Sequence, residues 1–361
     1  MKTGRTIQEM TVELQRQSET KADYLVNTGR LQMAVWDGQP MLHLLGEGGE
    51  DQMEPLEILT TAHRQLGNYL NIPQKYYDRM LQEDADLLSC NVNRWLQRTP
   101  EQRMIRTMDG RARAFLSNRY RRIDNIDIAR VTLPIIKEMP DARYESCQIT
   151  DDYMYLKVVN PRLTAEVVPG DIVQAGVVIS NSETGQGAVC IQPLIFRLVC
   201  SNGMGVNEAR TRRNHVGRVN STDENIAIYS QETLAADDHA FVLKIQDTVR
   251  AAVDEARFSQ VLGKMRESKQ AKLNTTDIPT VVKLTASNFG ITETEGQGVL
   301  QRLIEDADYT LYGLANAVTR FSQDVDSYDR ASKLEEVGYS IMTMSPALFR
   351  QINQLTAQKA A

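Results

Sequence analysis

The spacing of apolar residues changes near residue 220 of this 361-residue chain, and that change limits the folds available to it. Between Leu31 and Gly205, short runs in which apolar and polar residues alternate are frequent, the pattern typical of β-strands. From Thr222 to Lys269, apolar residues recur at three- and four-residue steps, which indicates helices. We therefore predict an α+β fold, in which one twisted, mainly antiparallel sheet with packed helices is followed by a helical C-terminal half.

Turn residues locate the strands within the first 220 residues. Asp109-Gly110 joins two alternating runs and predicts a hairpin, because both central residues of its turn need positive φ. Further strand pairs are expected around Asp37-Gly38, around Asp151-Asp152 and around the loop 182–187. The spacing predicts helices over 5–20, 56–70, 73–81, 87–97, 126–137, 222–269, from 278 onward, and over 296–306, 309–324 and 329–339. The polar tail 351–361 is expected to fray.

Three regions follow from this pattern. Residues 1–24 form an N-terminal helix or arm, 25–220 an α+β core, and 221–361 a helical region packed on that core. No internal repeat, low-complexity tract or linker separates them.

Composition favours a cytoplasmic protein that does not enter a membrane. No apolar run approaches the roughly 20 residues that a transmembrane helix needs, and the N-terminus has no apolar stretch typical of a signal peptide. The four cysteines lack metal-binding spacing and lie in apolar segments, so we expect reduced core residues.

The charge is distributed unevenly. Residues 91–122 hold nine arginines against two acidic residues, a local charge of +7, and because the whole chain carries −6, the rest carries −13. Strand alternation would place Arg111 and Arg113 on one face of the predicted hairpin. A second basic cluster follows residue 205 and contains Arg210, Arg212, Arg213, His215 and Arg218.

Sequence signatures of catalysis are missing. The four histidines are scattered singly, and no phosphate-binding loop or GxSxG nucleophile motif is present, so we expect no metal and no cofactor and do not expect an enzyme. Asp151-Asp152 is interpreted as a turn. Glu183, together with Asp171 or Asp151, would be the carboxylate set of a metal-dependent nuclease, which is the weakest alternative.

Four ordered segments have the arrangement of a known family: LGNYLNIPQKYYDRM, FLSNRYRRIDN, GVVISNSETGQGAVCIQPLIFRLVCSNGM and YTLYGLANAVTRFSQDVDSYDRASKLEEVG. Across residues 25–340 the chain resembles the domain-of-unknown-function family numbered 932, carried by phages and plasmids. The resemblance implies a mobile-element setting, and hence DNA metabolism, recombination or countering of host defences. It marks three motifs, whose positions are Ser117, Asn118, Arg119 and Tyr120; Asn181, Ser182, Glu183 and Gly185; and Arg197, Cys200, Asn202 and Gly203. Asn181–Gly185 and Asn202-Gly203 can equally be turns, whereas Arg197, inside an apolar strand, must be paired or face a ligand.

The leading hypothesis is a nucleic-acid-binding protein that binds or anneals single-stranded DNA in phage or plasmid recombination. Arginine forks would engage phosphates, and Trp95, Tyr120, Tyr153 and Tyr155 would stack on unpaired bases. The predicted binding residues are Arg94, Arg111, Arg113, Arg119, Tyr120, Arg121, Arg122, Arg197, Arg210, Arg212, Arg213 and Arg218. The alternative is a protein-interaction or anti-defence factor that engages host proteins through its acidic helical half. A third reading has the arginines simply pairing with the acidic surplus, and a homo-oligomer is compatible with any of these.

Overall fold

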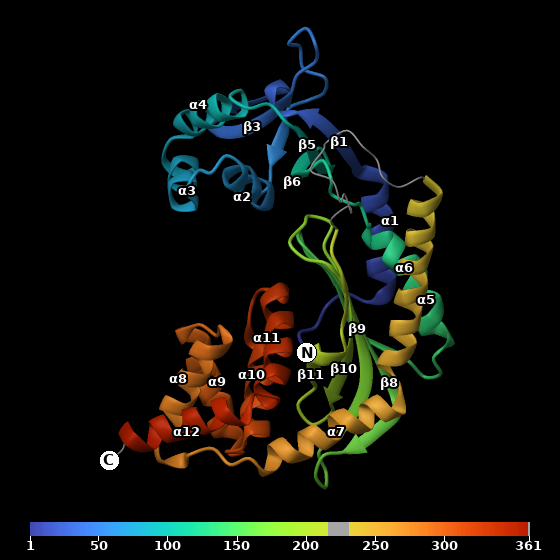
Figure 1. Ribbon diagram of the computed structural model, residues 1–361, viewed down its shortest axis with the longest axis vertical. Helices are drawn as coiled ribbons and strands as arrows, with labels where there is room; N and C mark the ends of the chain where they lie inside the picture. Colours follow the sequence, from blue (N-terminus) through green and yellow to red (C-terminus); the bar gives the residue numbers. More distant parts are fainter. Residues whose placement is uncertain (216–230, 360–361) are drawn as a thin grey trace.

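The computed structural model describes residues 1–215 and 231–359 and contains two sheets with helices packed against them (Figure 1). The predicted α+β class and the mainly antiparallel pairing are confirmed. The prediction of one sheet is wrong, because the strands divide between two six-stranded sheets. Alternation identifies a strand but not its neighbour: after β6 (Arg111–Ser117), the chain leads into α5 (Asn125–Glu138), which packs on the other sheet.

The first sheet has the strand order β1-β5-β6-β4-β3-β2, in which only β4 and β6 run parallel. Its other strands are β1 (Lys21–Asn27), β2 (Leu31–Trp36), β3 (Gln39–Leu44), β4 (Leu56–Ile58) and β5 (Gln102–Met108). Three helices bury Leu66, Tyr77 and Leu88 against this sheet. These are α2 (Thr60–Tyr69), α3 (Gln74–Glu83) and α4 (Ala85–Leu96).

Three local features of the first sheet bear on the predicted turn, the predicted helix from Leu56 and the predicted boundary after residue 24. Asp109 and Gly110 have φ values of 53° and 71°, so the predicted hairpin is confirmed. β4 lies where a helix was predicted from Leu56 onward, because these three residues bridge the ladder between β3 and β6. β1 begins at Lys21 and therefore crosses the predicted boundary between residues 24 and 25.

The second sheet has the order β11-β10-β9-β8-β7, with β12 also paired to β10. Its strands are β7 (Arg143–Ile149), β8 (Met154–Glu166), β9 (Ile172–Asn181), β10 (Val189–Arg197), β11 (Asn202–Gly205) and β12 (Thr211–Arg213). α1 (Ile7–Thr20), α5 and α6 (Gln231–Ala252) cover one face, and α11 (Tyr328–Met342) lies against the other (Figure 1). The face covered by α1, α5 and α6 buries a shared core that includes Met10, Ile135, Val177 and Ile245.

The helical half packs on this sheet through the largest apolar cluster, which joins Val173 and Ile195 of the strands to Tyr312 and Leu334 of the helices. Its remaining helices are α7 (Glu255–Gln270), α8 (Ile278–Phe289), α9 (Glu293–Asp306), α10 (Leu311–Phe321) and α12 (Pro346–Lys359). Short 3₁₀ helices are η1 (Thr28–Arg30), η2 (Asn207–Ala209), η3 (Thr275–Asp277) and η4 (Ser322–Asp324). α12 continues where a frayed tail was predicted, because Ile352 is buried in this cluster.

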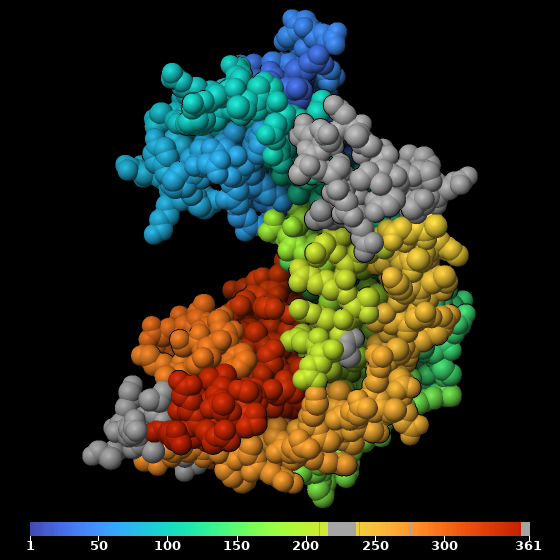
Figure 2. All heavy atoms as spheres, in the orientation of Figure 1, coloured from blue at the N-terminus to red at the C-terminus, as the bar shows by residue number. Residues whose placement is uncertain are grey.

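Figure 2 shows that the molecule is hollowed by a notch between α2 and α3, in blue and cyan, and the C-terminal helices, in orange and red. The loop between β9 and β10 lies at the inner end of this notch (Figure 1). That loop is tied to α2 because Gln65 donates to the Thr184 carbonyl at 2.7 Å and Arg64 donates to Gln186 Oε1 at 2.7 Å.

The cysteines are all free, and Cys147 is buried as expected. Cys90 is exposed, so its prediction as a core residue is wrong: α4 turns this position away from the sheet. Across the described ranges, none of the helices combines the length and apolar character required to cross a bilayer.

Candidate nucleic-acid interface

The two basic segments that sequence analysis singled out meet in space. The Arg121 amide donates to the His215 carbonyl at 2.6 Å. One residue earlier, the Tyr120 ring stacks on the His215 ring, with centroids 5.1 Å apart and planes 4° from parallel. The chain after β6 and the chain after β12 therefore lie side by side, and we call this contact and the β9–β10 loop beside it the sheet junction.

One carboxylate from α6 joins both basic segments. Asp237 Oδ2 accepts from Arg121 Nη1 at 2.9 Å and from Arg213 Nη2. Its hydrogen bonds to Arg121 and Arg213 lower the pKa of Asp237. Both arginines are thus neutralised in part and join the two segments to α6, and their role in phosphate binding stays a prediction.

Arg113, predicted as a binding residue, has a buried guanidinium in this structure. Its guanidinium pairs with Glu183 of the β9–β10 loop, and both side chains are 4% exposed. Glu183 also accepts from the amide of Asn125, at the start of α5, and lies 3.8 Å from the ammonium of Lys21. A carboxylate that carries these cationic partners holds the sheets together and is poorly suited to bind a metal ion.

Arg106, one of the nine arginines in the basic segment, is fully buried in the same network. It donates to both oxygens of Asp23, to Asp124 at 2.7 Å and to the Glu183 carbonyl at 3.0 Å. Burial alone would lower the pKa of Arg106, but its bonds to Asp23 and Asp124 raise it. Part of the positive charge of the β5–β6 hairpin is therefore buried inside the protein and does not face the polyanion predicted to bind there.

The second family motif builds the sheet junction. Asn181 is fully buried and donates to the Ile123 carbonyl and to Asn125 Oδ1, while its own Oδ1 lies 3.0 Å from His215 Nε2. Burial lowers the pKa of His215. Gly185 has φ of 78°, and a Cβ there would lie 2.7 Å from a Leu116 methyl group. The turn interpretation of this motif agrees with this geometry.

Arg197 lies outside the sheet junction. It is the last residue of β10 and forms two hydrogen bonds to Asp171, at 2.6 and 3.1 Å, while Tyr312 donates to the same carboxylate at 2.8 Å. Of the two expected alternatives, paired or facing a ligand, the structure shows Arg197 paired, and its role as a binding residue stays a prediction. Nearby, Asn202 donates to Thr319 and so joins β11 to α10.

Arg94 and Arg111 also lie apart from the sheet junction. Arg94 is exposed in the last turn of α4, whereas Arg111 begins β6, beside the Asp109–Arg16 ion pair. Six residue steps along β6 separate Arg111 from Ser117, roughly 20 Å at the rise of an extended strand. These two predicted binding residues therefore do not join the others.

Strand alternation divides the second basic cluster. Thr211 and Arg213 face α6: the Thr211 hydroxyl lies 2.9 Å from that of Thr248, and the Arg213 guanidinium lies 4.3 Å from the Phe241 ring centroid. Arg212 is opposite Cys190 across the ladder, points to the other face and is exposed. Arg218 lies outside the described residues.

Four predicted arginines therefore stay exposed on the two converging segments, and we call them the exposed arginine set. Arg122 is 60% exposed, and its contact with Asp23 is long, at 3.5 Å. The other three form no ion pair with another residue of the described ranges. The set is Arg119, Arg122, Arg210 and Arg212.

Three of the four predicted stacking rings are already occupied. The Tyr120 ring is covered by His215, and its hydroxyl donates to the Ser182 carbonyl at 3.1 Å, while its role as a binding residue stays a prediction. Tyr153 stacks on Tyr155, with centroids 5.6 Å apart, and donates to the Gln186 carbonyl. Only Trp95, 42% exposed, offers a large open surface.

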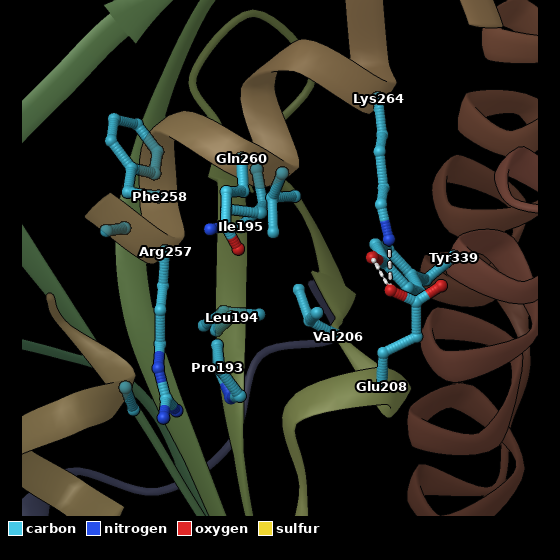
Figure 3. Close-up of a pocket in the computed structure, with 13 residues that line it drawn as sticks. Pro193, Leu194, Ile195, Val206, Glu208, Arg257, Phe258, Gln260, Lys264 and Tyr339 are labelled. Atoms are coloured by element: carbon cyan, nitrogen blue, oxygen red, sulfur yellow. Dashed lines mark hydrogen bonds and ion pairs between the residues drawn. The ribbon is translucent and has the colours of Figure 1, made fainter. Parts of the chain in front are cut away.

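Figure 3 shows a second hollow, of about 200 Å³, between β10 and α7. Leu194, Ile195 and Phe258 supply apolar walls, and the ion pair between Lys264 and Glu208 closes one side (Figure 3). None of the exposed arginine set lines it.

The carboxylates of the nuclease alternative are separated. Glu183 pairs with Arg113, whereas Asp171 pairs with Arg197 in another network. Asp151 and Asp152 lie in the turn between β7 and β8, as interpreted from sequence, and Asp152 accepts hydrogen bonds from Thr61 and Thr184, which join this turn to α2 and to the β9–β10 loop. Within residues 1–215 and 231–359, no three His, Cys, Asp or Glu side chains gather as metal ligands.

Comparison with known proteins gives one family. The model of a domain of unknown function (DUF932) matches residues 114–356, from β6 into α12 and about two thirds of the chain. The match begins much later than the resemblance placed at residue 25, so most of the first sheet lies outside it. No curated protein and no solved structure matches the chain.

Proposed function

The chain belongs to the DUF932 family, and we propose that it binds single-stranded nucleic acid through the exposed arginine set. The observation that carries this proposal is the contact between Arg121 and His215, which puts two basic segments about 90 residues apart beside each other. Arg119 and Arg122 belong to one segment, and Arg210 and Arg212 to the other. Their guanidinium forks match phosphate oxygens, and their exposure leaves them available to a polyanion.

The paired arginines support the proposal indirectly. Asp237 and Glu183 fix Arg121, Arg213 and Arg113, so the backbone that carries the exposed arginines is held in place before any ligand arrives. A preorganised site loses less conformational entropy on binding. The burial of these charges thus serves the interface without touching the nucleic acid.

Single strands are favoured over duplex because the chain also exposes aromatic rings, which lie on α3 and α4, apart from the exposed arginine set. Trp95 and Tyr76, 42% and 45% exposed, present ring surface that only unpaired bases can reach. A role in annealing or recombination on a phage or plasmid is the setting in which we place this binding.

Fluorescence anisotropy of a labelled oligothymidylate tests the proposal through two neighbouring residues with opposite orientation. Arg212→Ala should weaken binding roughly tenfold at about 50 mM salt, because one phosphate contact and its released counterions are lost. Arg213→Ala should lower stability and leave affinity within about twofold, because Arg213 is engaged by Asp237 and Phe241. Arg162→Ala, an exposed arginine paired with Asp141, is the control and should change nothing. Equal affinities for all three variants, or undetectable binding by the unaltered chain, would remove the proposal.

A protein-interaction or anti-defence role stays the competing prediction. It is favoured if a host protein is recovered with the chain after nuclease treatment while oligonucleotides fail to bind at low salt.

A further inference from the structure

An aromatic hollow of about 520 Å³ lies on the helical side of the first sheet. It is formed by the end of α2, the start of α3, the end of α4 and the residues that lead into β5. Its lining includes three aromatic side chains and one guanidinium, namely those of Tyr69, Tyr76, Trp95 and Arg98.

The rings of this hollow are unusually open to solvent. Trp95 and Tyr76 lie on different helices, and nearly half of each side chain remains exposed. Large aromatic side chains gain free energy when they are covered, so two that share an open hollow indicate a place where another flat or apolar group can bind. Tyr69 is less open, because the Arg103 guanidinium lies 4.0 Å from its ring centroid.

The lining of the hollow carries one cation and one anion, and the neighbouring Arg103 adds a second positive charge. Glu101, its one acidic lining residue, is paired with Arg103 at 2.9 Å. Arg98 is exposed, lies 5.2 Å from the Trp95 ring centroid and has no ion pair with another described residue. An aromatic surface with an adjacent guanidinium that has no carboxylate partner among the described residues suits a ligand that combines a flat ring with an anion.

We propose that this hollow binds an unpaired nucleotide, whose base stacks on Trp95 and Tyr76 and whose phosphate contacts Arg98. The inference rests on the proposed function and names a second contact region for the same ligand. A proline-rich peptide could also lie against these rings, but it has no anion for Arg98, so a nucleotide fits the observed charge better.

The two tryptophans of the chain make the test direct. Trp36, 79% exposed at the end of β2, does not line the hollow, so the Trp36→Phe variant leaves Trp95 as the sole tryptophan. Unlabelled oligothymidylate should quench the Trp95 emission, and quenching should saturate at the concentration at which anisotropy saturates. A polyproline peptide should leave the emission unchanged.

Matched substitutions measure the energetic contribution. Trp95→Ala should weaken binding roughly 5- to 150-fold, the loss expected for one stacked base, whereas Trp36→Ala should leave affinity unchanged. Trp95→Phe keeps a ring and should lose less, which separates stacking from any loss of folding. Arg98→Ala should weaken binding roughly tenfold at about 50 mM salt.

The outcomes distinguish this inference from the proposed function. Suppose that oligonucleotides bind and that Arg212→Ala lowers their affinity, but that Trp95→Ala and Trp36→Ala have the same affinity and the Trp95 emission does not change. The hollow is then not a nucleotide site. If anisotropy detects no binding by the unaltered chain, the proposed function itself fails. Quenching by the peptide and not by the oligonucleotide would overturn the choice of ligand.

Discussion

Buried charges at the sheet junction set the residue-scale energetics. Arg113 and Glu183 are withdrawn from water together, and each is tolerated because the other is present. Such a pair adds little net stability compared with apolar side chains, but its loss on one side leaves an uncompensated charge. Its role is therefore to hold the β9–β10 loop in one place.

Removing one member of this pair should be costly. Arg113→Met should lower the free energy of unfolding by about 3–5 kcal/mol, because Glu183 stays buried without its main partner. The double variant Arg113→Met with Glu183→Met should recover part of that loss. Urea unfolding measures both, with Arg79→Met in the exposed Arg79–Glu83 pair as the control, expected to cost under about 0.5 kcal/mol. A single-variant loss as small as that of the control would show that the pair is not buried.

His63 predicts a pH dependence of stability. Burial lowers its pKa from 6.5 to about 4 in the folded chain, where the ring lies 2.9 Å from the Tyr77 hydroxyl. The unfolded chain therefore takes up a proton below pH 6.5 that the folded chain does not, so stability falls as pH drops from about 6.5 to about 4. Between pH 7 and pH 5 this group should account for a loss of about 2 kcal/mol.

Urea unfolding of His63→Gln at both pH values checks this, because glutamine can keep a bond to Tyr77 without titrating. Between pH 7 and pH 5, the free energy of unfolding should fall by about 2 kcal/mol less in the variant than in the unaltered chain. Identical pH dependence in the two proteins would mean that His63 titrates normally.

The sequence showed which region is rich in arginine, but not which carboxylate each arginine pairs with. The nine arginines of residues 91–122 are evident as a cluster in the sequence. Their carboxylate partners are distant in the chain: Asp23 pairs with Arg106, Glu183 with Arg113, and Asp237 with Arg121. Only the fold determines which arginine finds a carboxylate and which faces solvent. For Arg197, burial within an apolar strand was enough to predict a partner or a ligand, but not to choose between them or to name Asp171.

At the scale of elements, local signals succeeded where the structure is decided locally. Asp109-Gly110 predicted its hairpin because the positive φ values required there are available to those residues. β4 was missed because three residues are too few to show a period, and the strand exists only through its neighbours β3 and β6. α12 was missed because its stability comes from Ile352 packed in the helical core.

Two glycines offer a test of the turn. Gly110→Ala should lower the free energy of unfolding by about 1 kcal/mol, because φ of 71° is strained for any residue with a Cβ. The strain comes from the backbone alone, since open space surrounds that position. Gly263→Ala, within α7 and also in open space, should stabilise by about 0.5–1 kcal/mol. Thermal unfolding of both variants measures the difference. Shifts of the same sign would contradict the assigned backbone conformations.

At the scale of the whole molecule, the sheet junction joins the first sheet to the second. Arg106 of β5 binds the Glu183 carbonyl, and Gln65 of α2 binds the Thr184 carbonyl, so the β9–β10 loop supports both bodies. Alternation in the sequence predicted strands but could not divide them between two sheets, because that division depends on long-range pairing. The notch in Figure 2 and the exposed arginine set both follow from this arrangement.

The central claim is that nucleic acid contacts the four exposed arginines, and the salt dependence of binding tests it most directly. For a single strand, the logarithm of the binding constant should fall against the logarithm of salt concentration with a slope of about −0.7 for each phosphate contact. The four contacts contribute about −3 to the slope, and the variant with alanine at Arg119, Arg122, Arg210 and Arg212 should lose that contribution and keep only the roughly −0.7 of the Arg98 contact. A slope near zero for the unaltered chain, or the same slope in both proteins, would contradict the claim.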